Sequence, residues 1–305
     1  MSAHPATTVS TSSTAAVLVC AFAILLLSTM DVLMKGLVLA IGVYSAVLWR
    51  SALAALIAGI AWASGPRIVP GRRTIGIHAR RAFAIGCVLI TFFWGLARLP
   101  LAEAIALSFV APLIALGMAA LLLGERIRSA AIWGSVAGLA GVAIVIAGQI
   151  GRSDYGTEAL AGSIAVLGST VFYAYNLILA RQQALVARPV EIAFFQNLML
   201  TAGMALAAPW LAVYVPSAAW PYLAGATILS LAGQMLMSWA YARAEAQYLI
   251  PIEYTAFVWA ILLGWLVFSE QVGWTTVAGA ALIIGGCLAA LRTRPDLVTE
   301  PVDAS

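Results

Sequence analysis

The stretch EAIALSFVAPLIALGMAALLLGER, residues 103–126, decides how the rest of this chain is interpreted. Its apolar part is about as long as the ~20 residues that a helix needs to cross a bilayer. Pro112 lies in its middle and Glu125 near its end. A similar stretch ends at Glu270, 145 positions after Glu125. The chain therefore contains an internal repeat, in which two similar units follow one another.

Further pairs of residues agree with this offset of 145 positions. They are Asp31 with Asn176, Arg98 with Arg243, Ala111 with Ala256, Gly134 with Gly279, and Gly141 with Gly286.

The composition is that of a polytopic membrane protein. Of the 305 residues, 63% are hydrophobic and 9% are charged, whereas a soluble domain carries about 25% charged residues. The three cysteines lie in apolar runs without metal-ligand spacing, and His4 and His78, the two histidines, are assigned to the N-terminal tail and a basic loop. We expect no metal site, no cofactor and no enzymatic activity.

Loop signals divide the chain into ten apolar spans, so we predict an all-α protein with ten transmembrane helices. The predicted spans are 15–36, 43–64, 80–98, 101–123, 129–149, 158–180, 190–212, 219–242, 247–269 and 273–291. We expect residues 1–14 to form a disordered N-terminal tail, 15–149 the first five-helix repeat, 158–291 the second, and 292–305 a cytoplasmic C-terminal tail.

The basic residues alternate between the two sides of this model. Twelve of the sixteen Lys and Arg residues fall on one side: Arg67, Arg72, Arg73, Arg80, Arg81, Arg126, Arg128, Arg181, Arg188, Arg243, Arg292 and Arg294. Lys35, Arg98 and Arg152 fall on the other, and Arg50 lies within a span. The positive-inside rule places the side with twelve, and both termini, in the cytoplasm.

Each predicted repeat contains five helices, an odd number, so the second repeat crosses the membrane in the opposite sense. Inverted repeats are typical of secondary transporters, in which two halves rearrange around a site near the midplane. The alternative is a duplicated membrane protein without a pathway, such as a scaffold or receptor.

These residues resemble the EamA-type domain of the drug/metabolite transporter superfamily. The family motif reads here as Ala111-Pro112, Gly124-Glu125, Gly134 and Gly141, and in the second copy as Ser269-Glu270, Gly279 and Gly286. The second copy departs from the motif, with Phe257 at the proline position and Pro251 earlier. Trp49-Arg50 also looks like the family pattern.

The resemblance covers nearly the whole chain. It implies ten helices in the inner membrane and export of small metabolites without an ATPase. Within the superfamily the chain is most similar to the YddG-type amino-acid exporters. That similarity implies aromatic amino acids, Thr or Met as substrates.

Polar residues at membrane depth are costly, so they mark candidate functional positions. We predict a substrate pocket of carbonyl, amide, acidic and aromatic groups that binds a zwitterion. Its residues are Ser108, Tyr173, Asn176, Gln234, Glu253 and Trp259. Structural pairing is the alternative for each, for example of Glu253 with Arg243.

Five further residues are candidates for coupling or gating: Asp31, Arg50, Glu103, Pro112 and Pro251. Asp31 lies one turn before Lys35 and could simply pair with it. Arg50 could pair with Glu103, which could also be an ordinary acid at a helix N-terminus. Pro112 leaves the carbonyl of Ser108 without its helical donor, which predicts a kink.

The sequence thus predicts a secondary transporter that exports amino acids by alternating access. A drug or nucleotide-sugar carrier of the same superfamily is the nearest alternative. The GxxxG pair Gly134 and Gly138, with Ala281 and Gly285, predicts close helix packing, either within the chain or in a homodimer.

Overall fold

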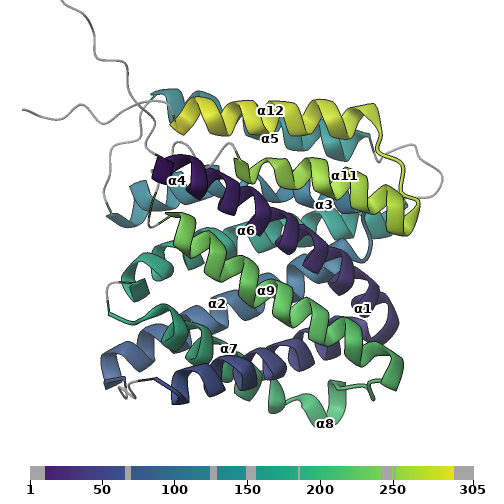
Figure 1. The fold of residues 1–305 in the computed structure, drawn as a ribbon. Helices are drawn as coiled ribbons and strands as arrows, with labels where there is room; N and C mark the ends of the chain where they lie inside the picture. Colours follow the sequence, from purple (N-terminus) through teal and green to yellow (C-terminus); the bar gives the residue numbers. More distant parts are fainter. Residues whose placement is uncertain are drawn as a thin grey trace, which may run out of the picture.

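The computed structural model describes residues 11–65, 70–123, 129–148, 156–184, 186–241, 243, 249 and 252–291. Within those ranges every regular element is a helix (Figure 1). Apolar helices and long hydrophobic runs make this an all-helical, multi-pass membrane protein.

The first two predicted spans form one long element, α1 (Thr11–Ala63), which turns back at Gly42 (Figure 1). The backbone of Gly42 has φ 77° and ψ 158°, a conformation that residues with a Cβ rarely adopt. The helix before it continues to this glycine, so the loop predicted after residue 36 is wrong. We call the end of the molecule that contains Gly42 the Gly42 end.

The predicted 101–123 span is divided into α3 (Leu101–Ser108) and α4 (Ala111–Leu123). The break lies at Phe109 and Val110, whose amides bond three residues back, to Ala106 and Leu107. Pro112 follows directly and cannot donate to the carbonyl of Ser108. The predicted kink is therefore present as an interruption of the helix.

The remaining helices depart from the prediction mainly at their ends. α2 (Arg72–Leu96) begins eight residues before the predicted start at residue 80. Residues 190–212 become α7 (Pro189–Ala205) and the short α8 (Ala208–Leu211). The others are α5 (Ser129–Ala147), α6 (Thr157–Ala184), the 3-10 turn η1 (Ser217–Ala219), α9 (Trp220–Tyr241), α11 (Thr255–Phe268) and α12 (Trp274–Leu291).

Glycines bring α5 and α12 together as an antiparallel pair along one flank of the molecule (Figure 1). A Cβ atom on Gly141 would lie 2.6 Å from the carbonyl oxygen of Gly279, and one on Gly286 would lie 2.5 Å from that of Gly134. The two contacts are equivalent by the repeat, because the offset of 145 positions relates Gly141 to Gly286 and Gly134 to Gly279. Gly285, predicted to belong to this surface, instead faces open space.

Other helix contacts also occur twice, once for each of the two repeats. The first arm of α1 corresponds to α6, and α2 to α9; accordingly α1 packs along α9 while α6 packs along α2. At the two helix interruptions, Phe109 and Tyr254 occupy equivalent positions and their rings meet edge to face, 5.0 Å apart. The contacts thus repeat when the two halves of the sequence are interchanged.

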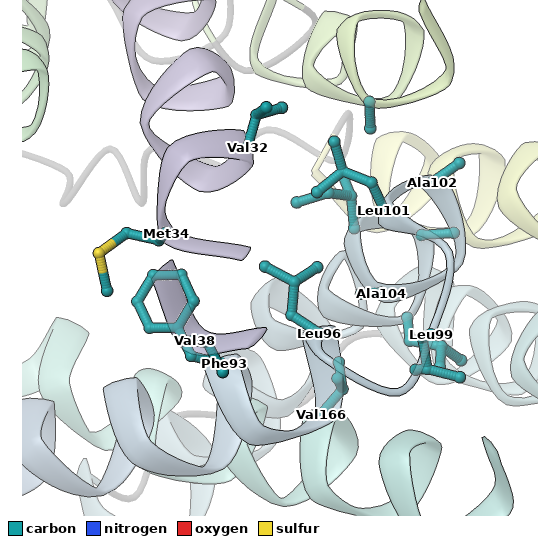
Figure 2. Packing of buried hydrophobic residues seen from close by; sticks show 14 of the residues in the cluster. Val32, Met34, Val38, Phe93, Leu96, Leu99, Leu101, Ala102, Ala104 and Val166 are labelled. Carbon is teal, nitrogen blue, oxygen red and sulfur yellow. The ribbon is translucent and has the colours of Figure 1, made fainter. Parts of the chain in front are cut away.

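The core near the Gly42 end surrounds the α2–α3 turn and includes residues of α1, α2, α3 and α6 (Figure 2). Met34 of α1, Phe93 and Leu96 of α2, and Leu101 of α3 are each at most 1% exposed. Burial of side chains this large stabilises the fold by roughly 1.5–3 kcal/mol each.

Among the described residues, four helical stretches are long and apolar enough to cross a membrane. They are Ala15–Ala63, Arg72–Leu96, Thr157–Leu177 and Ser217–Tyr241. Four shorter apolar stretches accompany them: Leu101–Ala115, Ile132–Ala147, Thr255–Phe268 and Trp274–Gly286.

Candidate functional site

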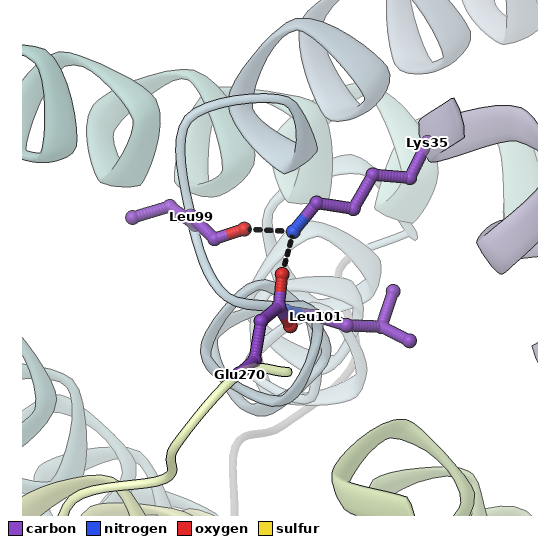
Figure 3. A network of polar contacts seen from close by, with 4 residues as sticks. All are labelled: Lys35, Leu99, Leu101 and Glu270. Carbon is purple, nitrogen blue, oxygen red and sulfur yellow. Dashed lines mark hydrogen bonds and ion pairs between the residues drawn. The ribbon is translucent and has the colours of Figure 1, made fainter. Parts of the chain in front are cut away.

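An ion pair between a buried lysine and a half-buried glutamate joins the two halves of the chain at the Gly42 end (Figure 3). Lys35 of α1 forms a salt bridge with Glu270, which follows α11. The Lys35 ammonium also donates to the carbonyl oxygen of Leu99 at 2.6 Å, and Glu270 accepts from the Leu101 amide at 2.7 Å. We call these four residues the Lys35 network.

The carboxylate of Glu270 thus caps an unsatisfied amide at the start of α3, where negative charge is favourable. This geometry excludes the pairing of Lys35 with Asp31 that their spacing suggested. A partner from the other copy lies closer to the ammonium than the acid one turn away. Glu125, the counterpart of Glu270, lies outside the described residues.

Glu103 is buried in the first turn of α3, 1% exposed, and accepts a hydrogen bond from Thr276 of α12 at 3.2 Å. The predicted position at a helix N-terminus is correct. The suggested pairing with Arg50 is wrong, because Arg50 bonds instead to Ser230 of α9.

Arg50 lies on the second arm of α1 and is 5% exposed. Its Nη1 donates to the Ser230 hydroxyl at 3.0 Å, and Gln234 donates to the same hydroxyl at 3.0 Å. Asp31, on the first arm, is close enough to Arg50 for the two charges to interact. Gln234 of the predicted pocket therefore belongs to the surroundings of Arg50.

A second polar network joins α2, α6 and α7 at the opposite end of the molecule. His78 is fully buried, stacks on Phe195 and contacts Gln183 and Glu191, with 3.5 Å between its Nε2 and the Glu191 carboxylate. Arg81 contacts Gln183 as well. We call His78, Arg81, Gln183 and Glu191 the His78 network, and this end the His78 end.

Asn176 of the predicted pocket joins this network, because its carbonyl accepts from Arg81 Nε at 2.9 Å. Arg81 and His78 were not predicted as site residues, because both were assigned to a loop and its edge. Pro70 and Gly71 are the signal that could have placed the start of the helix at Arg72.

Glu253, also at the His78 end, accepts a hydrogen bond from the Tyr241 hydroxyl. Tyr173 interacts electrostatically with both Glu253 and Arg81, so these three groups lie near one another. Arg243 instead donates to the Trp239 carbonyl and its guanidinium lies 4.1 Å from that ring. The suggested salt bridge of Glu253 with Arg243 is therefore wrong.

The other predicted residues are more dispersed. Trp259 packs against a small cluster that contains Cys20 and Ile24. The Ser108 hydroxyl bonds back to the Ile105 carbonyl at 2.7 Å, at the helix interruption. Pro251 lies outside the described residues. The structure thus brings Tyr173, Asn176 and Glu253 to one end, with Arg81 and Tyr241, and places Gln234 beside Arg50.

The chain belongs to the EamA-like transporter family, whose model matches residues 14–147 and again residues 160–292. This membership assigns it to the drug/metabolite class of membrane transporters that carry small metabolites.

Curated relatives carry different substrates. A pseudopaline exporter of Pseudomonas aeruginosa is 30% identical over 208 residues, which cover 68% of this chain and 71% of the relative. A riboflavin transporter of Rhizobium johnstonii is 32% identical over 203 residues, which cover 66% and 65%. An uncharacterised transporter of Helicobacter pylori is 29% identical over 236 residues, which cover 73% and 74%.

A solved crystal structure has the same fold, with a TM-score of 0.61 at 22% identity over 91% of this chain and 97% of the other.

Proposed function

We propose that this protein is a secondary transporter of ten helices, arranged as two inverted five-helix repeats, that exports amino acids. The supporting observation is that contacts repeat when the copies are interchanged. Equivalent helices α5 and α12 run antiparallel, so the axis that relates them is perpendicular to both helices. For helices that cross a bilayer, such an axis lies in the membrane plane, as in inverted-repeat transporters.

The distribution of positive charge orients the protein in this proposal. The His78 end carries the arginine-rich connections and faces the cytoplasm, while the Gly42 end faces outward. The Lys35 network then closes the outer side. Polar groups at the His78 end, including Arg81, Tyr173 and Glu253, form the entrance from the cytoplasm. Export therefore begins at the His78 end and requires the Lys35 network to separate.

Amino acids are the proposed substrates because the polar groups on the interior helices carry both signs of charge and are accompanied by aromatic rings. Ser108, Tyr173, Asn176, Gln234, Glu253 and Trp259 remain the proposed binding residues, now with Arg81 and Tyr241. Family membership supports transport rather than catalysis. The relatives are named for other substrates, pseudopaline and riboflavin.

Uptake of labelled Phe, Thr and Met into proteoliposomes, against protein-free vesicles and with or without a pH gradient, tests this function. We expect saturable flux that unlabelled amino acid blocks. Glu253→Gln should reduce the flux several-fold, whereas Glu158→Gln, a matched change at an exposed acid of the Gly42 end, should not. Absence of flux for all three amino acids, with folded protein, would refute amino-acid transport.

A further inference from the structure

Two charged residues, the half-buried Asp31 and the buried Arg50, lie on the two arms of α1 on either side of the Gly42 turn. The Arg50 side chain is 5% exposed, yet Ser230 is the one side chain that accepts from its guanidinium in the described part of the chain. Its Nε has no hydrogen-bond acceptor there. A guanidinium carries five donors, and leaving them unsatisfied away from water is costly.

The packing of α1 against α9 places Asp31 at the level of Ser230. A Cβ on Gly233 would lie 2.8 Å from Leu27, and one on Gly225 would lie 3.3 Å from Leu33, so the two helices run antiparallel. Asp31 follows Leu27 by one helical turn, on the same face of the helix. One turn back along α9 from Gly233 is the region of Ser230, which holds Arg50.

Asp31 and Arg50 therefore approach each other, and their charges interact. Among the described residues, however, the ion pairs are those of Lys35 with Glu270, His78 with Glu191, and Arg98 with Glu158. Asp31 and Arg50 are thus neighbours without direct contact. Because the two side chains do not contact each other, the Asp31 carboxylate and the Arg50 guanidinium can each bind an oppositely charged group of one small ligand.

Both residues also lie at the depth where inverted-repeat transporters bind their substrates. Asp31 precedes Gly42 by eleven residues and Arg50 follows it by eight. At 1.5 Å per residue these are distances of about 16 and 12 Å along the helix, close to half of a ~30 Å hydrocarbon layer. Substrate sites of such transporters lie near the midplane.

We infer that Asp31 and Arg50 form a zwitterion site, in which Arg50 binds the carboxylate and Asp31 the ammonium group of one amino acid. This inference rests on the proposed function and identifies where that substrate stops within the membrane. Tyr173 and Glu253 then line its entrance, nearer the His78 end.

The charges of the site favour a zwitterion over other small ligands. Asp31 and Arg50 together carry no net charge, and a zwitterion adds none. A simple anion or cation would leave one unbalanced charge in a region where each charge is expensive. Gln234 is exposed and donates to Ser230, so polar groups continue from Arg50 toward the accessible surface of α9.

Binding of three ligands to the purified full-length protein tests the two contacts separately. L-Phenylalanine has both charged groups, phenylalaninamide lacks the carboxylate, and 3-phenylpropionate lacks the ammonium group. For the unaltered protein we expect each deletion to weaken binding about ten- to a hundredfold, the usual effect of losing a charged hydrogen bond.

Arg50→Gln should abolish the preference for phenylalanine over phenylalaninamide, and Asp31→Asn the preference over 3-phenylpropionate. Arg98→Gln is the matched control, because the same change at an exposed pair of the Gly42 end should preserve both preferences. Should Arg50→Gln not fold, Ser230→Ala retains the guanidinium but removes its neutral partner. That variant should weaken phenylalanine binding and leave phenylalaninamide binding unchanged.

Equal weakening of all three ligands by Arg50→Gln, or by Ser230→Ala, would overturn the inference, because general structural damage does not distinguish the ligands. Phenylalanine flux in proteoliposomes separates the two levels of the argument. Flux with unchanged ligand preferences in the variants would refute this site alone. Absence of both flux and binding in the unaltered protein would refute amino-acid transport and this site with it.

Discussion

The two ends of the molecule use the same arrangement of helices but close it with different chemistry. At the His78 end, His78, Gln183 and Glu191 form a buried polar network between α2, α6 and α7. The offset of 145 positions relates them to Leu223, Val38 and Ala46 at the Gly42 end. Those three residues are buried and belong to the main hydrophobic core.

A second difference between the two ends is that here the Gly42 end has the charged residue. The Gly42 end has the buried Lys35 network, whereas the residue equivalent to Lys35 in the second copy is Ala180. The Gly42 end therefore joins apolar packing with the Lys35 network and the exposed pair of Arg98 and Glu158. The His78 end distributes its buried polar contacts over several side chains. Because polar groups can exchange their partners for water, the polar end opens to water at lower cost than the apolar end. A repeated backbone can therefore carry two unlike sets of side-chain contacts at its two ends.

Removal of the Lys35 charge is expected to have the largest effect. Lys35→Met leaves the half-buried Glu270 without its cation, which should lower the free energy of unfolding by about 3–5 kcal/mol. The double variant Lys35→Met/Glu270→Gln removes both charges and should recover part of that loss. Thermal unfolding of the purified protein in detergent measures both changes.

Arg98→Met serves as the control for the Lys35 variants, because its pair with Glu158 is exposed and should matter little. If the double variant were as unstable as Lys35→Met, the uncompensated charge would not be the cause. The Gly42 end would then be held by its apolar packing alone.

A transfer of the apolar chemistry to the His78 end should have a smaller effect. His78→Leu copies Leu223 but deprives Glu191 of a buried partner, at about 1–3 kcal/mol, while Gln183 keeps its contact with Arg81. The triple variant His78→Leu/Gln183→Val/Glu191→Ala copies all three apolar counterparts and should regain stability. Denaturation midpoints of the two variants measure the difference.

A triple variant less stable than His78→Leu would contradict the equivalence of the two ends. Transport assays sharpen the same comparison. In the proposed transport cycle an apolar His78 end should open to water less readily, so the triple variant should transport more slowly even where its stability is restored.

A substitution in the contact between α5 and α12 is expected to have the smallest of the three effects on stability. Gly141→Ala would place a Cβ 2.6 Å from the Gly279 carbonyl oxygen and separate the helices. Overpacking of this kind costs about 1–3 kcal/mol. Gly285→Ala is the matched control on α12, since nothing lies within 4 Å of that position. Equal unfolding temperatures for the two variants would exclude close packing at Gly141.

Most of the helices were predictable from the sequence because hydrophobicity over about twenty residues decides membrane insertion locally. The break before Pro112 was predictable for a similar reason, since a missing amide is a property of the residue itself. The early start of α2 at Arg72 was not predicted. In the sequence, polar residues such as His78 and Arg81 are typical of a loop. Only the folded chain shows that partners on α6 and α7 satisfy their hydrogen bonds within a helix.

The candidate site was predicted less well than the helices. Asn176 and Glu253 were found by their polarity, but their partners Arg81 and Tyr241 were not. Pairing proposed from short spacing failed for Asp31 with Lys35 and for Glu253 with Arg243. In each case a more distant residue provided the contact.

By itself, the sequence determined the class of protein, its duplication and the distribution of its charges, because composition and periodicity are properties of the chain alone. The tertiary structure decided which charges meet. Lys35 selects Glu270 from a position 235 residues away, and Arg50 selects Ser230 from 180 away. Which residues form these contacts depends on how the helices pack against one another. Buried charges at membrane depth bind whichever group the packing brings to them, since water cannot take its place.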